Sequence, residues 1–131
     1  IPNLNCKVVA GAANNQLLDP VEHDRALKDR NIIYVPDYLL NRMGIVNCAN
    51  ENYGYVKNDP MITRHFGREW ENAIFNIAIS VLTNAQKEGI PTGLAANKLG
   101  DQLAEEEHPI MGHRAWSIIQ GLIADKWAEQ K

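Results

Sequence analysis

Residues 6–17 read CKVVAGAANNQL, and residues 32–41 read IIYVPDYLLN. Each segment opens with a short apolar run rich in β-branched residues and then meets a glycine or a proline. This pattern predicts two short strands, at residues 6–10 and 32–35, and the first strand is expected to be buried. Pro36 stops the second strand because proline has no N–H to donate to a sheet.

A helix is predicted between these two strands. Asp19 is placed to cap its beginning, Pro20 suits the first helical position, and Glu22 supplies the acid of a capping box three residues after the cap. The helix is expected to end near Arg30. Strand, helix and strand in this order are typical of a βαβ unit, in which the strands are parallel and the crossover is right-handed.

The rest of the chain is predicted to be helical. After Gly54, apolar residues recur every three or four positions on one face of a long helix: Phe66, Trp70, Ile74, Ile77, Val81 and Ala85. Gly89 and Pro91 predict the end of this helix, and Thr92 is predicted to cap the next one. A last helix carries a stripe of Trp116, Ile119, Ile123 and Trp127. Two parallel strands make a small sheet, so partner strands are expected upstream or in another subunit.

The composition limits the classes of function. A chain of 131 residues with 45% hydrophobic residues predicts one domain, residues 1–131, with no internal boundary. Thirteen basic and sixteen acidic residues give a net charge of −3, which argues against a nucleic-acid partner. The apolar runs are far shorter than the roughly 20 residues that cross a bilayer. Cys6 and Cys48 form no CxxC pattern, so the sequence predicts neither a disulfide nor a zinc site and favours a reducing cytoplasm.

The loops after the two strands, residues 11–17 and 36–48, are where a βαβ fold binds ligands. In the first loop, small residues let a flat ring approach the backbone. Its adjacent Asn14 and Asn15 offer the donors and acceptors that a nicotinamide carboxamide and ribose hydroxyls require. Taken alone, this loop is explained more simply as a polar turn.

The second loop leads into a predicted helix in which polar residues interrupt an apolar stretch. Asp37 is interpreted as the residue that caps its helix. Four polar side chains interrupt the apolar stretch that follows: Asn41, Asn47, Asn50 and Glu51. Burying such groups costs free energy unless they meet partners or a ligand, so the loop is a candidate binding segment.

Together the two segments resemble those of the glutamate, leucine, phenylalanine and valine dehydrogenase family. In that family a strand ends in a Gly-small-Ala-Asn-Asn-type motif, and a Pro-Asp-(aromatic)-x-x-Asn-Ala-Gly-Gly motif follows further along the chain. This sequence matches the second motif, with the expected separation, at Pro36, Asp37, Tyr38, Asn41 and Gly44. The similarity continues through residues 52–55, the long helix and residues 89–97, so it covers nearly the whole chain.

The resemblance implies an α/β fold, namely the second half of a Rossmann-like cofactor domain, with a parallel β-α-β order followed by C-terminal helices. It implies a reversible, NAD-linked oxidative deamination of an L-amino acid to a 2-oxo acid and ammonia, and NADP is not excluded as the cofactor. By position, Gly11, Ala12 and Asn14 would lie against the nicotinamide end of the cofactor. Asn15 would brace the loop, and Asn41 would lie near the nicotinamide ribose or the reacting centre.

The same resemblance implies that Ile45 and Cys48 line the pocket for the substrate side chain. Neither residue offers a charged group to a distal carboxylate, so an apolar amino acid is predicted in preference to glutamate. The chain departs from the motif at Arg42 and Met43, where the family has Ala and Gly. These two large side chains would shrink the pocket, alter the approach of the ligands, or mark a branch with another substrate.

Two motifs of the family are missing from the chain: the GxGxxG cradle for the pyrophosphate, and a Gly-rich segment whose lysines hold the substrate carboxylate. No catalytic residue is therefore assigned to this chain, which is interpreted as a fragment that does not turn over substrate alone. The alternative is a non-catalytic binding or scaffolding module that kept the α/β core. If the domain that covers the last helix in the family is absent, its apolar stripe predicts self-association into a homo-oligomer.

A cluster of acidic and imidazole side chains near the C-terminus is interpreted as a solvated helix end rather than a metal site. Its members are Glu105, Glu106, Glu107, His108 and His113. Pro109 separates its two histidines, and the HExxH spacing is absent. His23 and His65 are predicted to be surface residues.

Overall fold

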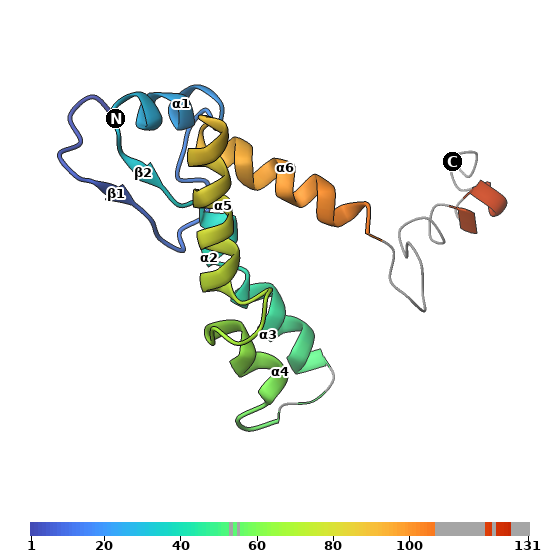
Figure 1. Ribbon diagram of the computed structural model, residues 1–131. Coiled ribbons are helices and arrows are strands. Elements are labelled where there is room, and N and C mark those ends of the chain that lie inside the picture. The colour runs from blue at the N-terminus through green and yellow to red at the C-terminus, as the bar shows by residue number, and fades with distance from the viewer. Residues whose placement is uncertain (53, 55, 107–119, 122, 127–131) are drawn as a thin grey trace. The chain divides into compact units, whose positions relative to one another are not determined.

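The computed structural model describes residues 1–52, 54, 56–106, 120–121 and 123–126 (Figure 1). The elements follow in the order β1 (Val8–Val9), α1 (Glu22–Asp29), β2 (Ile33–Tyr34), α2 (Asp37–Leu40), α3 (Met43–Asn52), α4 (Pro60–Thr63), the 3₁₀ helix η1 (Arg64–Phe66), α5 (Ile74–Glu88) and α6 (Thr92–Ala104). The chain forms two compact units, Ile1–Leu99 and Gly100–Lys131, and the boundary between them falls within α6.

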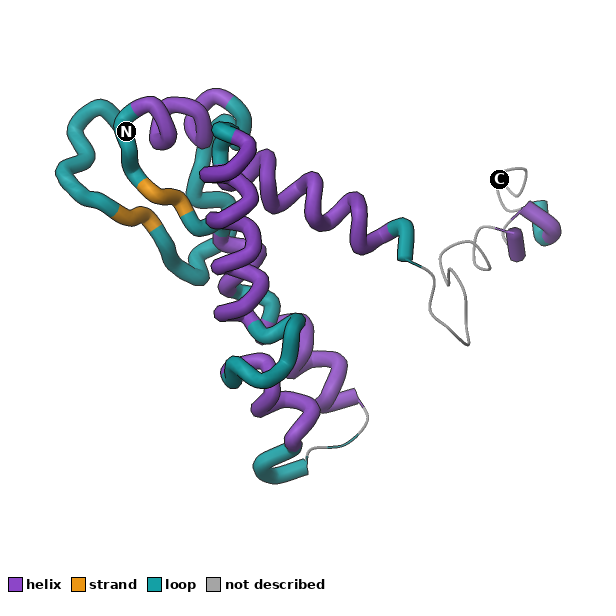
Figure 2. Tube along the Cα trace, in the orientation of Figure 1, coloured by secondary structure: helices purple, strands orange, loops and turns teal. Residues whose placement is uncertain are grey.

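The two strands pair in parallel, and α1 connects them (Figure 2). Val8 lies opposite Ile33 and Val9 lies opposite Tyr34. The ladder is extended by the backbone N–H of Val35, which donates to the carbonyl oxygen of Val9 at 2.9 Å. The predicted α/β class, with a parallel βαβ unit followed by helices, is therefore confirmed.

The prediction of a buried strand at residues 6–10 is wrong in two respects. The strand is shorter, Val8–Val9, and 51% of the surface of Val8 is exposed. Within the described residues β1 pairs only with β2. A strand with one neighbour has an open edge, so its β-branched side chains are not enclosed as they would be inside a larger sheet.

Asp19 accepts hydrogen bonds at the beginning of α1, as the sequence predicts, but the helix begins at Glu22, so the prediction of Pro20 as its first helical residue is wrong. Oδ1 of Asp19 accepts from the backbone N–H groups of Val21 at 2.9 Å and Glu22 at 2.7 Å, and these bonds lower the pKa of Asp19. The backbone N–H of Asp19 itself donates to Nδ1 of His23 at 3.3 Å instead of to Glu22. His23 is accordingly half-buried and is not the surface residue that the sequence predicts.

The long helix is shorter than the apolar periodicity predicts. It begins at Ile74, so Phe66 and Trp70 precede it, in η1 and in the irregular segment of residues 67–73. The side-chain amide of Asn76 donates to the carbonyl oxygens of Arg68 at 2.8 Å and Trp70 at 2.7 Å. These bonds satisfy backbone acceptors that a continuous helix would have satisfied with its own N–H groups.

Two small cores hold the first unit together. The first is formed by Leu27, Ile32 and Tyr34, and α1 packs on β2 around it. The second is formed by Val81 and Ala85 of α5 and Ala95 and Ala96 of α6, with Leu39 of α2 packed against them. Because α2 packs on α5, the loop that follows β2 is joined to the second core.

Gly89 ends α5 in the left-handed conformation, with φ of 65°. A Cβ at this position would meet nothing within 4 Å, so the cost of Gly89→Ala is purely conformational. We expect Gly89→Ala to lower the free energy of unfolding by about 1 kcal/mol. Urea unfolding measures this change. The matched control is Gly100→Ala, an exposed position inside α6 with equally free space, where alanine is expected to stabilise the chain. Equal effects at both positions would contradict the left-handed cap.

Among the described residues, no helix has both the length and the hydropathy needed to cross a membrane. Cys6 and Cys48 are both free and exposed. Of the stripe predicted on the last helix, Trp116, Ile119 and Trp127 lie outside the described residues, and Ile123 is 63% exposed.

Candidate functional site

The loops that follow β1 and β2 meet through two asparagine side chains. Nδ2 of Asn41 donates to Oδ1 of Asn14. Asn14 is exposed and Asn41 is half-buried, so the pair keeps polar atoms at the surface. Both residues follow the carboxyl ends of adjacent parallel strands, which is where α/β folds place their ligand sites. The structure therefore brings together two residues, 27 positions apart, that the sequence predicts in one cofactor site.

The first loop is folded closely upon itself around Gly11. Nε2 of Gln16 donates to the carbonyl oxygen of Gly11 at 2.9 Å. A Cβ at Gly11 would lie 3.2 Å from that same nitrogen, which is closer than ordinary van der Waals contact. Gly11 is half-buried, while Ala12 is exposed beside it. The loop thus presents small side chains next to the asparagine pair.

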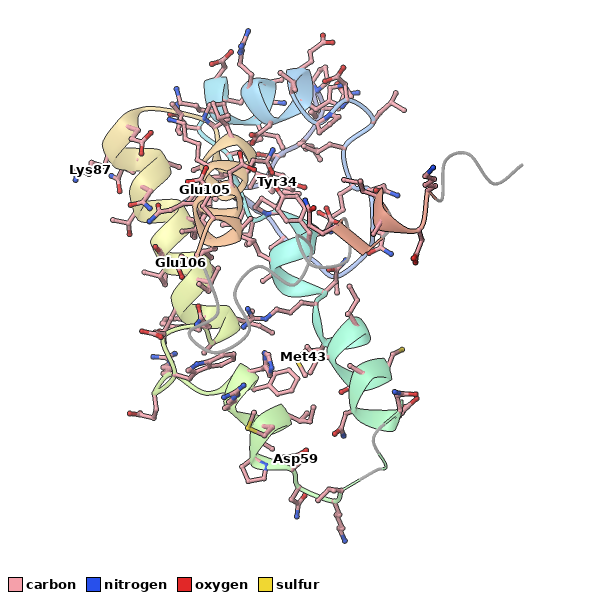
Figure 3. All side chains as sticks on the ribbon, turned by 90° about the vertical axis from the view of Figure 1, so that its right-hand side faces the viewer. Tyr34, Met43, Asp59, Lys87, Glu105 and Glu106 are labelled. Carbon is pink, nitrogen blue, oxygen red and sulfur yellow. The ribbon has the colours of Figure 1, made fainter. Side chains whose placement is uncertain are left out.

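Asp37, in the second loop, forms a further link to the first loop. Its Oδ2 accepts from the backbone N–H of Asn15 at 3.3 Å, and its Oδ1 accepts from the hydroxyl of Tyr34 at 3.3 Å (Tyr34 is labelled in Figure 3). Burial, and then the charge of Asp37, raise the pKa of Tyr34 to about 12, so this hydroxyl remains a donor at neutral pH. Asn15 has φ of 56°, a left-handed conformation that asparagine tolerates.

The prediction that Asp37 caps its helix is wrong. The residue before α2 is Pro36, which provides no side-chain cap, and Asp37 is the first helical residue. Its carboxylate points to the first loop and to Tyr34 rather than to the N–H groups of its own helix. The capping rule uses local spacing, and a partner 22 residues away is outside its reach.

Asp24 is a second buried carboxylate, and the sequence analysis did not single it out. It is 3% exposed, and it accepts from the backbone N–H of Leu94 at 3.2 Å and from the hydroxyl of Thr92 at 3.4 Å. Asp24 therefore caps α6 from α1, although the sequence predicts Thr92 as the cap. The available signal was its position three residues before Leu27, which places an acid on the buried face of α1.

Ile45 and Cys48 lie one helix further along the chain, on α3. They are three residues apart and so share a face of the helix, and both are exposed, Ile45 to 80%. A cavity of about 490 Å³ adjoins the first loop, but Ile45 and Cys48 are not among its lining residues, which include Asn15, Leu17 and Tyr38. Both side chains are accessible to a ligand, and their place in a substrate pocket remains a prediction.

The sequence of the chain is similar to those of two amino-acid dehydrogenases. The chain is 36% identical over 120 residues to leucine dehydrogenase from Thermoactinomyces intermedius, covering 92% of the chain and 30% of that protein. It is 38% identical over 112 residues to valine dehydrogenase from Streptomyces coelicolor, covering 83% of the chain and 28% of that protein. The chain is homologous to leucine and valine dehydrogenases.

A solved structure supports the same relation. The crystal structure of L-tryptophan dehydrogenase from Nostoc punctiforme matches 77% of the chain and 28% of its own length, with a TM-score of 0.67 and 31% sequence identity. No protein-family model matches the chain. The chain spans less than a third of the length of these relatives.

The two residues that depart from the dehydrogenase motif are partly buried. Arg42 donates from Nη2 to the carbonyl oxygen of Asn72, in the segment that precedes α5. Met43, labelled in Figure 3, is the first residue of α3 and is half-buried. The guanidinium of Arg42 is thus directed to the segment before α5.

His65 lies in the same region and is not the surface residue that the sequence predicts. It is half-buried, its ring meets that of Trp70 edge to face at 4.8 Å, and its Nδ1 is buried. Burial lowers the pKa of His65, and the charges of Arg42 and Arg64 lower it further. This imidazole is therefore neutral at neutral pH.

No three His, Cys, Asp or Glu side chains come together as a potential metal site in the described part of the chain. Of the C-terminal acidic and imidazole cluster, Glu105 and Glu106 are exposed. Glu107, His108 and His113 lie outside the described residues.

Proposed function

We propose that this chain is the nicotinamide-side, C-terminal part of the dinucleotide-binding domain of an NAD-dependent amino-acid dehydrogenase. The reaction is the reversible oxidative deamination of an apolar L-amino acid, of the leucine, valine or phenylalanine type, to a 2-oxo acid and ammonia. The observation that carries the proposal is the contact between Asn14 and Asn41 at the carboxyl ends of two parallel strands. The homology to leucine and valine dehydrogenases supports it.

The residues at the strand ends fit the polar groups of a nicotinamide nucleotide. Each asparagine amide carries two donors and one acceptor oxygen, and the contact between Asn14 and Asn41 occupies only part of that capacity. The carboxamide and ribose hydroxyls of the cofactor have the complementary groups. Ala12 is exposed and has no side chain beyond Cβ, so a flat ring can approach it, whereas the Gln16 side chain lies beside Gly11.

The chemistry divides between the cofactor and the chain. When bound, NAD accepts the hydride that leaves the α-carbon of the amino acid. In this proposal Asn14 and Asn41 orient the nicotinamide end of the cofactor. Asp37 fixes the position of the first loop relative to the second through its bonds to Asn15 and Tyr34. Ile45 and Cys48 provide the apolar surface for the substrate side chain and exclude water from it. NADP in place of NAD is compatible with these residues.

The test of the proposal uses the full-length product of the reading frame that contains the chain. NADH oxidation is followed with ammonia and a series of 2-oxo acids, and NADH binding is measured separately by titration. Turnover of a branched-chain or aromatic 2-oxo acid supports the proposal. If NADH binds without turnover of any 2-oxo acid, the dehydrogenase activity is refuted. If NADH does not bind, the alternative of a non-catalytic binding or scaffolding module replaces the proposal.

Substrate selectivity is expected to depend on Ile45. We expect kcat/KM to be higher for the 2-oxo acids of leucine or valine than for that of glutamate, because neither Ile45 nor Cys48 can pair with a distal carboxylate. Ile45→Ala is expected to lower kcat/KM for the leucine-type substrate by about tenfold, since apolar contact with the substrate is lost. The control is Val21→Ala. Val21 is the residue before α1, and its side chain is also largely exposed, at 70%. A preference for the glutamate-type substrate would overturn the assignment of the pocket.

A further inference from the structure

Arg42 lies in the turn between α2 and α3, directly after Asn41, and its side chain binds the segment that precedes α5. Its Nη2 donates to the carbonyl oxygen of Asn72, and its guanidinium carbon lies 6.0 Å from the centre of the Trp70 ring. Its Nε is buried and makes no hydrogen bond. A buried donor without a partner costs free energy, so a residue that served packing alone would be better replaced by an apolar one.

The segment that receives Arg42 is itself held in place from several directions. The guanidinium of Arg64 lies 4.0 Å from the centre of the Trp70 ring, and His65 meets the same ring edge to face. Asn76, in the first turn of α5, donates to the carbonyl oxygen of Trp70 at 2.7 Å. The segment that Arg42 binds is therefore held by contacts of its own.

The turn that carries Arg42 is short, so a displacement at Arg42 moves Asn41. The backbone N–H of Asn41 donates to the carbonyl oxygen of Asp37 at 2.8 Å, and the backbone N–H of Gly44 donates to the carbonyl oxygen of Asn41 at 3.2 Å. After Arg42 the chain continues into α3, where Val46 donates to the carbonyl oxygen of Arg42 at 3.1 Å. The backbone on both sides of Arg42 is thus hydrogen-bonded.

We propose that Arg42 is a positioning residue for the cofactor: it clamps the α2–α3 turn to the segment before α5 and so holds the amide of Asn41 on Asn14. The inference rests on the proposed function, because it assigns the role of Arg42 through the asparagine pair. It accounts for a large charged side chain where the dehydrogenase motif has a small residue. Arg42 does not touch the cofactor; it acts on the geometry of the residue that does.

The test is a double-mutant cycle on NADH affinity in the full-length product of the reading frame. Arg42→Met keeps most of the length of the side chain and removes the guanidinium. It is expected to weaken NADH binding by about threefold to tenfold, the loss that follows from one displaced hydrogen bond. In the Asn41→Ala background, Arg42→Met is expected to have no further effect, because the group that it positions is already gone. The matched control is Arg68→Met, whose guanidinium lies 4.0 Å from the centre of the Phe75 ring.

A second readout separates positioning from general damage and from failure of the proposed function. In nuclear magnetic resonance spectra, the side-chain amide protons of Asn41 are expected to exchange faster with solvent in Arg42→Met than in the unaltered protein. Unchanged affinity and unchanged exchange in Arg42→Met would refute the positioning role. If Asn41→Ala does not alter NADH affinity, the proposed function is what fails, and the exchange rate alone then decides whether Arg42 holds Asn41.

Discussion

Asn41→Ala is expected to weaken NADH binding by about tenfold to hundredfold, which corresponds to about 1 to 3 kcal/mol for a polar group of the bound ligand left without its partner. The same substitution is expected to change the free energy of unfolding by no more than about 0.5 kcal/mol. The reason is that Oδ1 of Asn14, which loses its donor, lies on an exposed residue where water replaces the missing bond. A large loss of affinity with little loss of stability is the signature of a binding residue.

Titration of NADH against each variant, with urea unfolding of the same samples, measures both quantities. Asn14→Ala is expected to behave like Asn41→Ala, and the double variant is expected to lose less affinity than the sum of the two. Asn97→Ala is the control, because Asn97 is also exposed and accepts a hydrogen bond from the Tyr38 hydroxyl at 3.1 Å. A folded Asn41→Ala protein with unaltered affinity would remove the main support for the cofactor site.

The parts of the fold that the sequence predicts correctly depend on neighbouring residues. Asp19 accepts from N–H groups two and three residues away, and Gly89 ends α5 by its own backbone conformation. The βαβ order likewise follows from runs of apolar residues and the signals between them. The βαβ order also predicts that the loops after the two strands meet at one edge, and the contact between Asn14 and Asn41 joins these loops.

The features that the sequence analysis missed depend on contacts between distant residues. Asp37 binds the N–H of Asn15, Arg42 binds the carbonyl oxygen of Asn72, and Asp24 binds the N–H of Leu94, at separations of 22, 30 and 70 residues. Local spacing predicts that an acidic residue before a helix caps that helix. It cannot predict a partner on another helix or strand. The late beginning of α5, at Ile74, has a similar cause, since the Asn76 amide stabilises a bend before the helix that periodicity alone cannot detect.

Asp24→Ala is expected to lower the free energy of unfolding by about 2 to 4 kcal/mol. About 1 kcal/mol of this is the loss of a helix cap, and the remainder is the cost of leaving the N–H of Leu94 and the hydroxyl of Thr92 without an acceptor in a partly buried position. The contact also joins α1 to the beginning of α6, so its loss separates elements that are distant in the chain. Urea unfolding measures the change, and a loss below about 1 kcal/mol would show that α6 is capped by other means.

The same carboxylate makes stability depend on pH. Burial raises the pKa of Asp24 above its usual value of 3.8, although the bonds from Leu94, Gly93 and Thr92 act in the opposite direction. The pKa of Asp24 is therefore higher in the folded protein than in the unfolded one. Its contribution to the free energy of unfolding is fully present below the unfolded pKa and is lost as the pH rises through the folded pKa. Asp24→Asn cannot ionise. Its stability relative to the unaltered protein is therefore expected to rise as the pH increases from about 4 to 7, and a constant difference would contradict the direction of the shift.

Gly93→Ala tests the same contact from the other side. A Cβ at Gly93 would lie 2.7 Å from Oδ2 of Asp24, so the substitution is expected to destabilise the protein by about 1 to 3 kcal/mol. In the Asp24→Ala background the opposing oxygen is absent, and alanine then favours the helix over glycine by about 1 kcal/mol. Gly93→Ala is therefore expected to change from destabilising to stabilising when Asp24 is removed. Additive effects of the two substitutions would show that the carboxylate does not rest against the beginning of α6.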